Sequence, residues 1–363
     1  MKNRRSGVFI IAFLLLFVLS GCQPHQHSFS EWVTTRAATC TSPGIQTGIC
    51  SCGSEEIISV PPTGHQWKDA SCTIPKHCTI CAKREGSALG HISDGGNICS
   101  RCGNKIDETI VLPLEGKTIL NFGDSIFGNA RPPKDVSTFL ATATGATVHN
   151  VAFGGCRMGK HIGNWDAFSM YRLADAIASG DWSMQDNALN YTDRTSYAET
   201  PLALLKSLDF NNVDVITIAY GTNDFTGENR LDDAANKYNT KTFAGALRYS
   251  IEKIQSAYPN IQIILCTPTY RFWMDSDGSF LYDSDTYEKV GYKLTDFVQK
   301  TKDVAKEYGL TVIDNYYGCG IDSSNKDVCF PSNDGTHPNQ TGRELIAKYM
   351  ANALIVFFEK QAQ

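Results

Sequence analysis

Apolar and polar positions follow two different rhythms along the C-terminal part of the chain. Short, nearly continuous apolar runs, which are typical of buried parallel strands, occur at residues 118–122, 147–152, 213–220, 261–266 and 311–313. Apolar residues at helical spacing mark residues 134–143, 242–257, 287–308 and 340–358. Strands that alternate with helices in this way predict one α/β domain at residues 115–361, with a parallel sheet covered on both faces.

The first 22 residues show the pattern of an export signal. Basic residues within the first five positions precede an uncharged apolar run from residue 8 to 19. The run ends in Leu-Ser-Gly-Cys, which resembles a bacterial lipobox with Cys22 as the lipidated residue. We therefore expect a lipoprotein signal at 1–22 and a polar tether at 23–36. Two acyl chains on Cys22 would anchor the protein to the outer face of the cell membrane. An ordinary cleaved secretory signal is the alternative.

Composition adds two limits to this picture. The chain has 363 residues, of which 42% are apolar and 20% are charged, so one large domain with a sizeable core and a smaller segment are both possible. The formal net charge of -5 leaves no basic surface of the kind that nucleic-acid binding requires. Nucleic acid is therefore not expected as a partner.

A cysteine-rich segment at residues 37–103 separates the tether from the large domain. It contains few large aliphatic residues, so it needs disulfides or metal for stability. Its eight cysteines are Cys40, Cys50, Cys52, Cys72, Cys78, Cys81, Cys99 and Cys102. The two C-x2-C pairs fit a zinc ribbon, and the four ligands would be Cys78, Cys81, Cys99 and Cys102.

An irregular repeat in the same segment allows a second grouping of ligands. Each repeat offers three thiolates and one imidazole, and the two sets are Cys40, Cys50, Cys52 and His65, and Cys72, Cys78, Cys81 and His91. A disulfide framework is the remaining alternative, because the space outside the membrane is oxidising. With zinc or with disulfides, the segment is interpreted as a spacer or binding element and not as a catalytic one.

Three short motifs carry the candidate chemistry. Gly-Asp-Ser at 123–125 directly follows the first strand, and Gly-Thr-Asn-Asp at 221–224 follows the third. Asp-Gly-Thr-His-Pro at 334–338 precedes the last helix. In a parallel α/β sheet, ligands bind beyond the carboxyl ends of the strands, so all three motifs are expected at one edge. A serine, an amide and a histidine three residues after an aspartate are groups that attack an acyl carbonyl and hold its oxyanion.

On these motifs the chain resembles the SGNH, or GDSL-type, hydrolases, a superfamily of esterases and lipases with a flavodoxin-like three-layer α/β/α fold. The resemblance covers residues 117–358 and implies a catalytic triad without a cofactor. Ser125 would be the nucleophile, His337 the general base, and Asp334 the residue that orients the imidazole. The backbone N–H of Ser125, a glycine N–H and the Asn223 side chain would form the oxyanion hole.

The glycine of the oxyanion hole has two candidates in this sequence. The family pattern places it five residues after an asparagine, which selects Gly155 in Asn-Val-Ala-Phe-Gly-Gly-Cys, with Gly154 as the alternative. Phe127 occupies the last position of a Gly-x-Ser-x-Gly elbow, so the α/β-hydrolase fold is not predicted. Asp124 and Asp224 are interpreted as structural residues that bond loop backbone. Cys319 and Cys329 flank the segment before Asp334, and they are candidates for a disulfide or for two buried free thiols.

Aromatic residues outside the motifs suggest a substrate class. Residues 159–200 and 270–287 are rich in tyrosine and tryptophan, and both stretches leave the sheet at the expected active edge. Aromatic faces beside polar groups suit a carbohydrate that carries a small ester, although such rings also serve as packing residues. We expect an esterase, in particular a deacetylase of acylated polysaccharide. A lysophospholipase or thioesterase with the same triad, and a tethered surface-binding protein with an inert hydrolase fold, are the alternatives.

Overall fold

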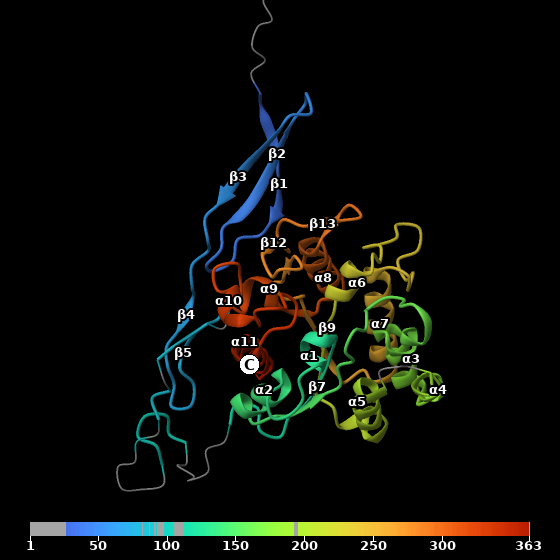
Figure 1. Ribbon diagram of the computed structural model, residues 1–363. Coiled ribbons are helices and arrows are strands. Elements are labelled where there is room, and N and C mark those ends of the chain that lie inside the picture. Colours follow the sequence, from blue (N-terminus) through green and yellow to red (C-terminus); the bar gives the residue numbers. More distant parts are fainter. Residues whose placement is uncertain are drawn as a thin grey trace, which may run out of the picture. The chain divides into compact units, whose positions relative to one another are not determined.

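The computed structural model describes residues 27–81, 83–86, 88–90, 92, 98–104, 112–191 and 195–362 (Figure 1). The expected signal at 1–22, the expected lipidation site Cys22 and the candidate ligand His91 lie outside the described residues. Contacts divide the chain into two compact units between Gly64 and His65. This division falls inside the cysteine-rich segment, which the sequence treats as one module. Among the described residues, none of the helices has the length and apolarity needed to span a bilayer.

The first unit holds a three-stranded antiparallel sheet in the order β1-β2-β3. Its strands are β1 (Phe29–Arg36), β2 (Gly44–Cys50) and β3 (Glu55–Val60). The prediction of a tether over 23–36 is therefore wrong for residues 29–36. The reason is local: Trp-Val-Thr-Thr at 32–35 is rich in aromatic and β-branched residues, which favour a pleated strand. These residues pair along β2.

The second unit begins with a small antiparallel sheet and continues into the α/β domain. The small sheet contains β4 (Trp67–Lys68), β5 (Lys76–Cys78) and β6 (Arg84–Glu85). The central sheet contains β7 (Thr118–Gly123), β8 (Thr147–Asn150), β9 (Val215–Ala219), β10 (Gln262–Cys266) and β15 (Thr311–Ile313). Its five strands are all parallel and lie in the order β15-β10-β9-β7-β8. This is the flavodoxin-like order, whose switch point lies between β7 and β9.

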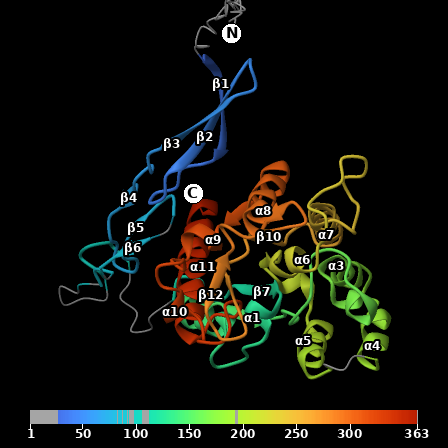
Figure 2. The same ribbon diagram turned by 45° about the horizontal axis from the view of Figure 1, so that its top comes forward.

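Helices cover both faces of the central sheet (Figures 1 and 2). One face packs on α2 (Val136–Thr144) and α11 (Gln340–Gln361). The other packs on α3 (Met170–Ser179), α4 (Ser183–Leu189), α5 (Thr195–Ser207), α7 (Phe243–Ala257) and α8 (Leu294–Tyr308). Every residue of β9 is buried, because Val-Ile-Thr-Ile-Ala offers apolar or small side chains to both layers. The three-layer α/β/α fold predicted from the sequence is confirmed.

Short elements complete the domain and carry its loops. They are α1 (Ser125–Gly128), α6 (Thr222–Thr226), α9 (Asn315–Gly318), α10 (Lys326–Cys329), two 3₁₀ turns (Gly163–Phe168 and Phe210–Asn212) and the hairpin strands β11 (Phe272–Met274) and β12 (Phe280–Asp283). The helix predicted at 287–308 starts only at Leu294. Before it, β13 (Glu288–Lys289) and β14 (Tyr292–Lys293) form a hairpin, since Val290 and Gly291 both have positive φ.

Candidate active site

Ser125 lies at the carboxyl end of β7, as the first residue of α1. Asp124 caps this turn, and its carboxylate accepts a hydrogen bond from the backbone N–H of Ile126 at 3.0 Å. The cap fixes the backbone around the serine, whose side chain is largely buried at the edge of the sheet. The strand end therefore presents the hydroxyl from a defined turn.

His337 and Asp334 come from one loop between α10 and α11. The Asp334 carboxylate lies 2.6 Å from His337 Nδ1. Its other oxygen accepts the backbone N–H groups of Thr336 at 2.7 Å and of His337 at 3.1 Å. Partial burial raises the pKa of Asp334, but these hydrogen bonds and the imidazole outweigh burial, so its pKa lies below the usual value. Asp334 is therefore held as a carboxylate that accepts from Nδ1.

The two parts of the site meet at the imidazole. His337 Nε2 lies 2.9 Å from Ser125 Oγ, although 212 residues separate the two in the chain. Asp334, His337 and Ser125 thus form one continuous chain of hydrogen bonds. A serine in this arrangement can pass its proton to the imidazole while its oxygen attacks an electrophilic carbon.

Asn223 reaches the same edge from α6, directly after β9. Its Nδ2 donates to the carbonyl of Cys156 at 3.0 Å. A side-chain amide carries two N–H groups, so this bond orients Asn223 and leaves a second donor. Gly221, which begins this turn, has φ of 131° and a Cβ there would lie 2.7 Å from Pro268, so no other residue fits.

Asp224 connects the Asn223 turn to the loop that follows β8. Its carboxylate accepts the backbone N–H groups of Met158 at 2.8 Å and Gly159 at 2.9 Å, and the side chain of Asn229 at 2.9 Å. Burial raises the pKa of Asp224 in spite of these donors. The residue bonds loop backbone, as expected from the sequence. Gly155 belongs to the loop that Asp224 holds and has φ of 80°.

Arg271 is a buried part of the site that the sequence reading missed. Its Nη1 donates to Thr226 Oγ1 at 3.1 Å and its Nη2 to Thr336 Oγ1 at 2.5 Å. The guanidinium also lies 4.3 Å from the ring centre of Trp273. Burial lowers the pKa of Arg271 to about 10, against the opposing charges of Asp124 and Asp334. The sequence feature that could have indicated a buried arginine is the charged residue among aromatic ones in Tyr-Arg-Phe-Trp at 270–273.

A cavity of about 500 Å³ adjoins this arginine and the triad loop. Arg271, Trp273, Asp334 and Thr336 contribute to its wall. From the aromatic stretch 270–287, Phe272 and Trp273 line this cavity, whereas Tyr270 is buried in the core. Trp273 remains partly exposed.

The aromatic residues of 159–200 divide in the same way. Tyr171 is buried, and Trp165 and Trp182 pack against the core. Tyr191 is exposed. For this stretch, most of the rings are therefore packing residues.

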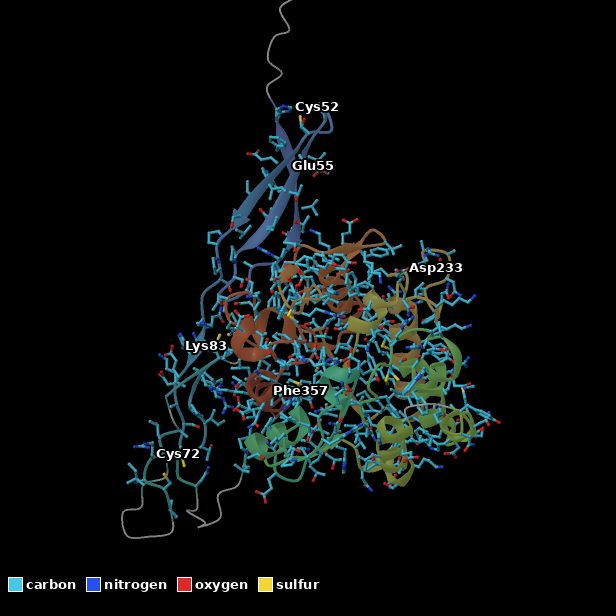
Figure 3. The ribbon with its side chains drawn as sticks, viewed as in Figure 1. Cys52, Glu55, Cys72, Lys83, Asp233 and Phe357 are labelled. Atoms are coloured by element: carbon cyan, nitrogen blue, oxygen red, sulfur yellow. The ribbon has the colours of Figure 1, made fainter. Side chains whose placement is uncertain are left out.

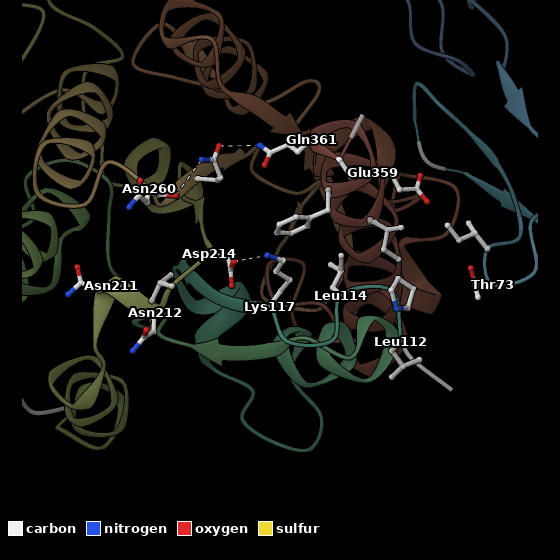
Figure 4. A pocket seen from close by; sticks show the side chains of 17 residues that line it. Thr73, Leu112, Leu114, Lys117, Asn211, Asn212, Asp214, Asn260, Glu359 and Gln361 are labelled. Atoms are coloured by element: carbon white, nitrogen blue, oxygen red, sulfur yellow. Dashed lines mark hydrogen bonds and ion pairs between the residues drawn. The ribbon is translucent and has the colours of Figure 1, made fainter. Parts of the chain in front are cut away.

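A second cavity, of about 880 Å³, lies at the opposite edge of the sheet (Figure 4). Lys117, Asp214 and Gln262, which stand at or before the amino ends of β7, β9 and β10, belong to its lining. An ion pair of 2.9 Å joins Lys117 to Asp214. None of the triad residues lines this cavity, so its position separates it from the candidate chemistry.

The metal-ligand sets predicted from the sequence are wrong in their grouping. Cys99 and Cys102 lie with Cys72, whereas Cys78 and Cys81 lie with His65. A single zinc ribbon of Cys78, Cys81, Cys99 and Cys102 is therefore not formed. The N–H of Gly90 donates to the carbonyl of Cys72 at 2.9 Å, which ties Cys72 to the segment that leads to Cys99.

The alternative sets are not reproduced as predicted either. His65 lies with Cys78 and Cys81, while Cys50 and Cys52 lie with His27, a residue that neither set included. Each of the three described groups could hold a metal ion. Cys319 and Cys329 are buried thiols without a disulfide between them.

Comparison with known proteins identifies the domain. The model of the GDSL-like lipase/acylhydrolase family matches residues 121–345. No curated protein matches the chain. One solved structure aligns with a TM-score of 0.50 at 21% identity, over 66% of this chain and 97% of the other.

Two further solved structures show the range of these similarities. A lipase candidate from Chitinophaga pinensis aligns with a TM-score of 0.44 at 19% identity, over 68% of this chain and 98% of that one. A carbohydrate acetylesterase from Sinorhizobium meliloti aligns with a TM-score of 0.41 at 13% identity, over 67% and 100%. At these identities the similarity concerns the fold.

Proposed function

Because the chain belongs to the GDSL-like lipase/acylhydrolase family and is an ester hydrolase, we propose that Ser125, His337 and Asp334 are its catalytic triad. The observation that carries this assignment is the hydrogen-bond chain from Asp334 through His337 to Ser125, at 2.6 and 2.9 Å. A histidine within reach of the nucleophile and oriented by a carboxylate is the arrangement that acyl transfer requires.

The proposed reaction has two halves. In the first, His337 takes the proton of Ser125 as Oγ attacks the ester carbon, and returns it to the leaving alcohol when the tetrahedral intermediate collapses. In the second, His337 activates a water that hydrolyses the acyl-enzyme. Asp334 stays ionised and stabilises the imidazolium in both halves. The reaction needs no cofactor.

The oxyanion of each intermediate is proposed to accept three hydrogen bonds. The donors are the backbone N–H of Ser125, the backbone N–H of Gly155 and the side-chain amide of Asn223. The bond from Asn223 to the Cys156 carbonyl supports this role, because it fixes the amide plane before substrate binds. Preorganised donors of this kind stabilise the transition state without the cost of reorganisation.

An assay with p-nitrophenyl acetate tests the triad. A Ser125→Ala variant is expected to lose at least about 10³-fold in kcat. Ser207→Ala serves as the matched control, since that serine is exposed on α5. A fluorophosphonate probe should label the wild type and the control but leave Ser125→Ala unlabelled. Equal hydrolysis by all three proteins would remove the serine mechanism.

For substrate, we propose an ester on carbohydrate, with a short acyl group such as acetyl. The cavity beside the triad supports this choice, because it combines Arg271, Asp275 and Asp334 with the partly exposed Trp273. Polar groups beside an aromatic surface suit a sugar better than a fatty chain. A series of acyl esters from acetyl to palmitoyl decides the question, together with acetylated xylan. Preference for long chains would favour a lysophospholipase or thioesterase.

The same chain is proposed to work outside the cell, tethered to the membrane through lipid on Cys22, with the cysteine-rich segment as a zinc-stabilised spacer. The support is the sequence of the first 22 residues. Radiolabelled palmitate should be incorporated into the wild type, and Cys22→Ala should abolish incorporation and release activity from the membrane fraction. Retention of the label in Cys22→Ala would contradict lipidation at this residue.

A further inference from the structure

Three turns in the N-terminal part of the chain have the same backbone design. In each, the N–H of the first cysteine donates back across the turn: Cys50 to the carbonyl of Ser54 at 2.9 Å, Cys78 to Lys83 at 2.7 Å and Cys99 to Asn104 at 2.7 Å. Such a turn places the sulfurs of two nearby cysteines on one side. The design recurs in both compact units, so it does not depend on one local environment.

Two of the turns share a further feature, a glycine with positive φ directly after the second cysteine. Gly53 has φ of 86° and Gly103 has φ of 73°. The N–H of each donates to the carbonyl of the first cysteine, Cys50 or Cys99, at 2.8 Å. A residue with a side chain would be strained at these positions, so the glycines preserve the presentation of the sulfurs.

The sulfur atoms receive backbone hydrogen bonds as thiolates do. Cys78 Sγ accepts the N–H of Ile80 at 3.4 Å, and Cys99 Sγ accepts the N–H of Arg101 at 3.4 Å. The donor is in both cases the second residue after the cysteine. Donors aimed at sulfur stabilise negative charge on it, and the thiolate is the form that binds metal.

A third ligand comes to each turn from elsewhere in the chain. His27 Nδ1 lies 3.3 Å from Cys52 Sγ, His65 Nδ1 lies 3.2 Å from Cys81 Sγ, and Cys72 Sγ lies 3.7 Å from Cys99 Sγ. Within each group all ligand atoms lie within 4.8 Å of one another. Tetrahedral zinc with Zn–S bonds of about 2.3 Å separates two sulfurs by about 3.8 Å, and a sulfur and a nitrogen by slightly less.

We propose that these groups are three separate zinc sites, formed by Cys50, Cys52 and His27, by Cys78, Cys81 and His65, and by Cys99, Cys102 and Cys72. The residues named here supply three corners of each tetrahedron, and a further side chain or a water completes it. The ligands are soft thiolates and imidazoles, which select zinc over calcium or magnesium. The proposal does not depend on the esterase function.

The composition of the groups favours metal over disulfides. A disulfide joins two sulfurs, so it would use only two of the three cysteines in the third group and neither imidazole of the other two groups. A metal ion uses every member. The sulfurs of Cys72 and Cys99, at 3.7 Å, are also separated by more than the 2.05 Å or so of a bond.

The third site has a consequence for how the segment is built. Cys72 precedes the Cys78–Cys81 turn in the chain but contributes to the site of the next turn, with Cys99 and Cys102. A metal there fastens two successive repeats to each other. Figure 3 shows Cys72 in this segment and Cys52 at the end of the β2–β3 hairpin. Zinc thus replaces the hydrophobic core that the segment lacks.

Zinc content of the full chain, measured by plasma mass spectrometry, tests the sites and their grouping. Wild type is expected to hold about three equivalents, and Cys72→Ser and Cys99→Ser about one fewer each. The double variant Cys72→Ser/Cys99→Ser should also lose about one, because both residues serve one ion. Cys78→Ser/Cys99→Ser should lose about two. Cys266→Ala, a buried cysteine of β10, is the control with unchanged zinc.

Two results would overturn the proposal. Loss of only one equivalent in Cys78→Ser/Cys99→Ser would place those cysteines in a single ribbon site. Wild-type protein that contains no zinc, or iron in place of zinc, would exclude zinc sites. If its cysteines also failed to react with thiol reagents in denaturant, they would be identified as disulfides. Hydrolysis of p-nitrophenyl acetate by each variant reports separately that the catalytic domain is folded.

Discussion

Arg271 donates a hydrogen bond of 2.5 Å to Thr336, the residue that precedes His337 in the triad loop. The same guanidinium donates to Thr226, at the end of the helix that carries Asn223. One buried cation therefore connects the loop of His337, the proposed general base, to the helix of Asn223, the proposed oxyanion donor. Because these two segments meet only in the folded protein, we expect Arg271 to act as a positioning residue for both.

Replacement of Arg271 by lysine is expected to lower kcat by about 10- to 100-fold with little change in KM. Lysine keeps the charge but lacks the planar, forked guanidinium that lets Arg271 donate to Thr226 and Thr336 at once. Hydrogen bonds from a charged donor contribute about 1.5–3 kcal/mol each, and their loss would let the two loops shift. The measurement is steady-state kinetics on p-nitrophenyl acetate.

Arg248→Lys is the matched control for that variant. Arg248 is also a largely buried arginine, but it pairs with Asp232 and Glu307 on the helical layer. Its replacement should lower the melting temperature and leave kcat unchanged. If Arg271→Lys affected only the melting temperature, as the control does, the positioning role would be lost.

The amide of Asn223 gives a prediction about the oxyanion. Asn223→Ala should lower kcat by about 10²–10³-fold with KM nearly unchanged, because an oxyanion donor acts mainly in the transition state. Asn211→Ala, at an exposed asparagine before β9, is the control and should retain full activity. Wild-type kcat in Asn223→Ala would show that the bond to Cys156 is the whole role of this side chain.

Several of these features followed from the sequence alone. The strand before Asn223 is predictable because an apolar, β-branched run of this length is typical of a strand buried on both faces. Asp334 and His337 were identified because three residues within one loop suffice to join a carboxylate to an imidazole. Both patterns lie within one short segment, so they can be recognised without knowledge of the tertiary structure.

Other features depend on contacts between distant segments, which spacing does not encode. Arg271 matters because Thr226 and Thr336 approach it from different loops. Cys72 lies nearer in sequence to Cys78 and Cys81 than to Cys99. Its sulfur nevertheless lies with that of Cys99, and its carbonyl accepts a hydrogen bond from the N–H of Gly90. The late start of α8 follows from positive φ at Val290, which no helical pattern reveals.

Asp124 leads to a prediction about pH and stability. Complete burial, with the charge of Asp224 adding to it, raises the pKa of Asp124 to about 7 against the opposing effects of the Ile126 N–H and Arg271. The folded state then keeps a proton that the unfolded chain, with a pKa near 3.9, releases. The stability contributed by this group is complete below about pH 4 and is lost as the pH rises through about 7.

Asp124→Asn should remove this loss while preserving the cap, since asparagine is also a good N-cap. The melting temperature of this variant should exceed that of wild type by more at pH 8 than at pH 5. In free energy of unfolding, the gain at pH 8 should be larger by about 2–3 kcal/mol. Asp209→Asn, at an exposed cap, should show no such dependence. The same gain at both pH values would mean that Asp124 does not titrate in this range.

The proposed oxyanion glycine, Gly155, can be tested through its backbone. Gly155 has φ of 80°, but a Cβ there would meet nothing within 4 Å, so a side chain is opposed by conformation alone and not by crowding. Gly155→Ala should cost about 1–2 kcal/mol of stability and lower kcat, because relaxation of φ turns the N–H away from the oxyanion.

Asparagine tolerates the positive-φ region better than alanine. Gly155→Asn should therefore keep more of both stability and kcat than Gly155→Ala. A ranking that instead follows side-chain size, with asparagine the worse of the two, would contradict a backbone role for Gly155 and turn attention to Gly154.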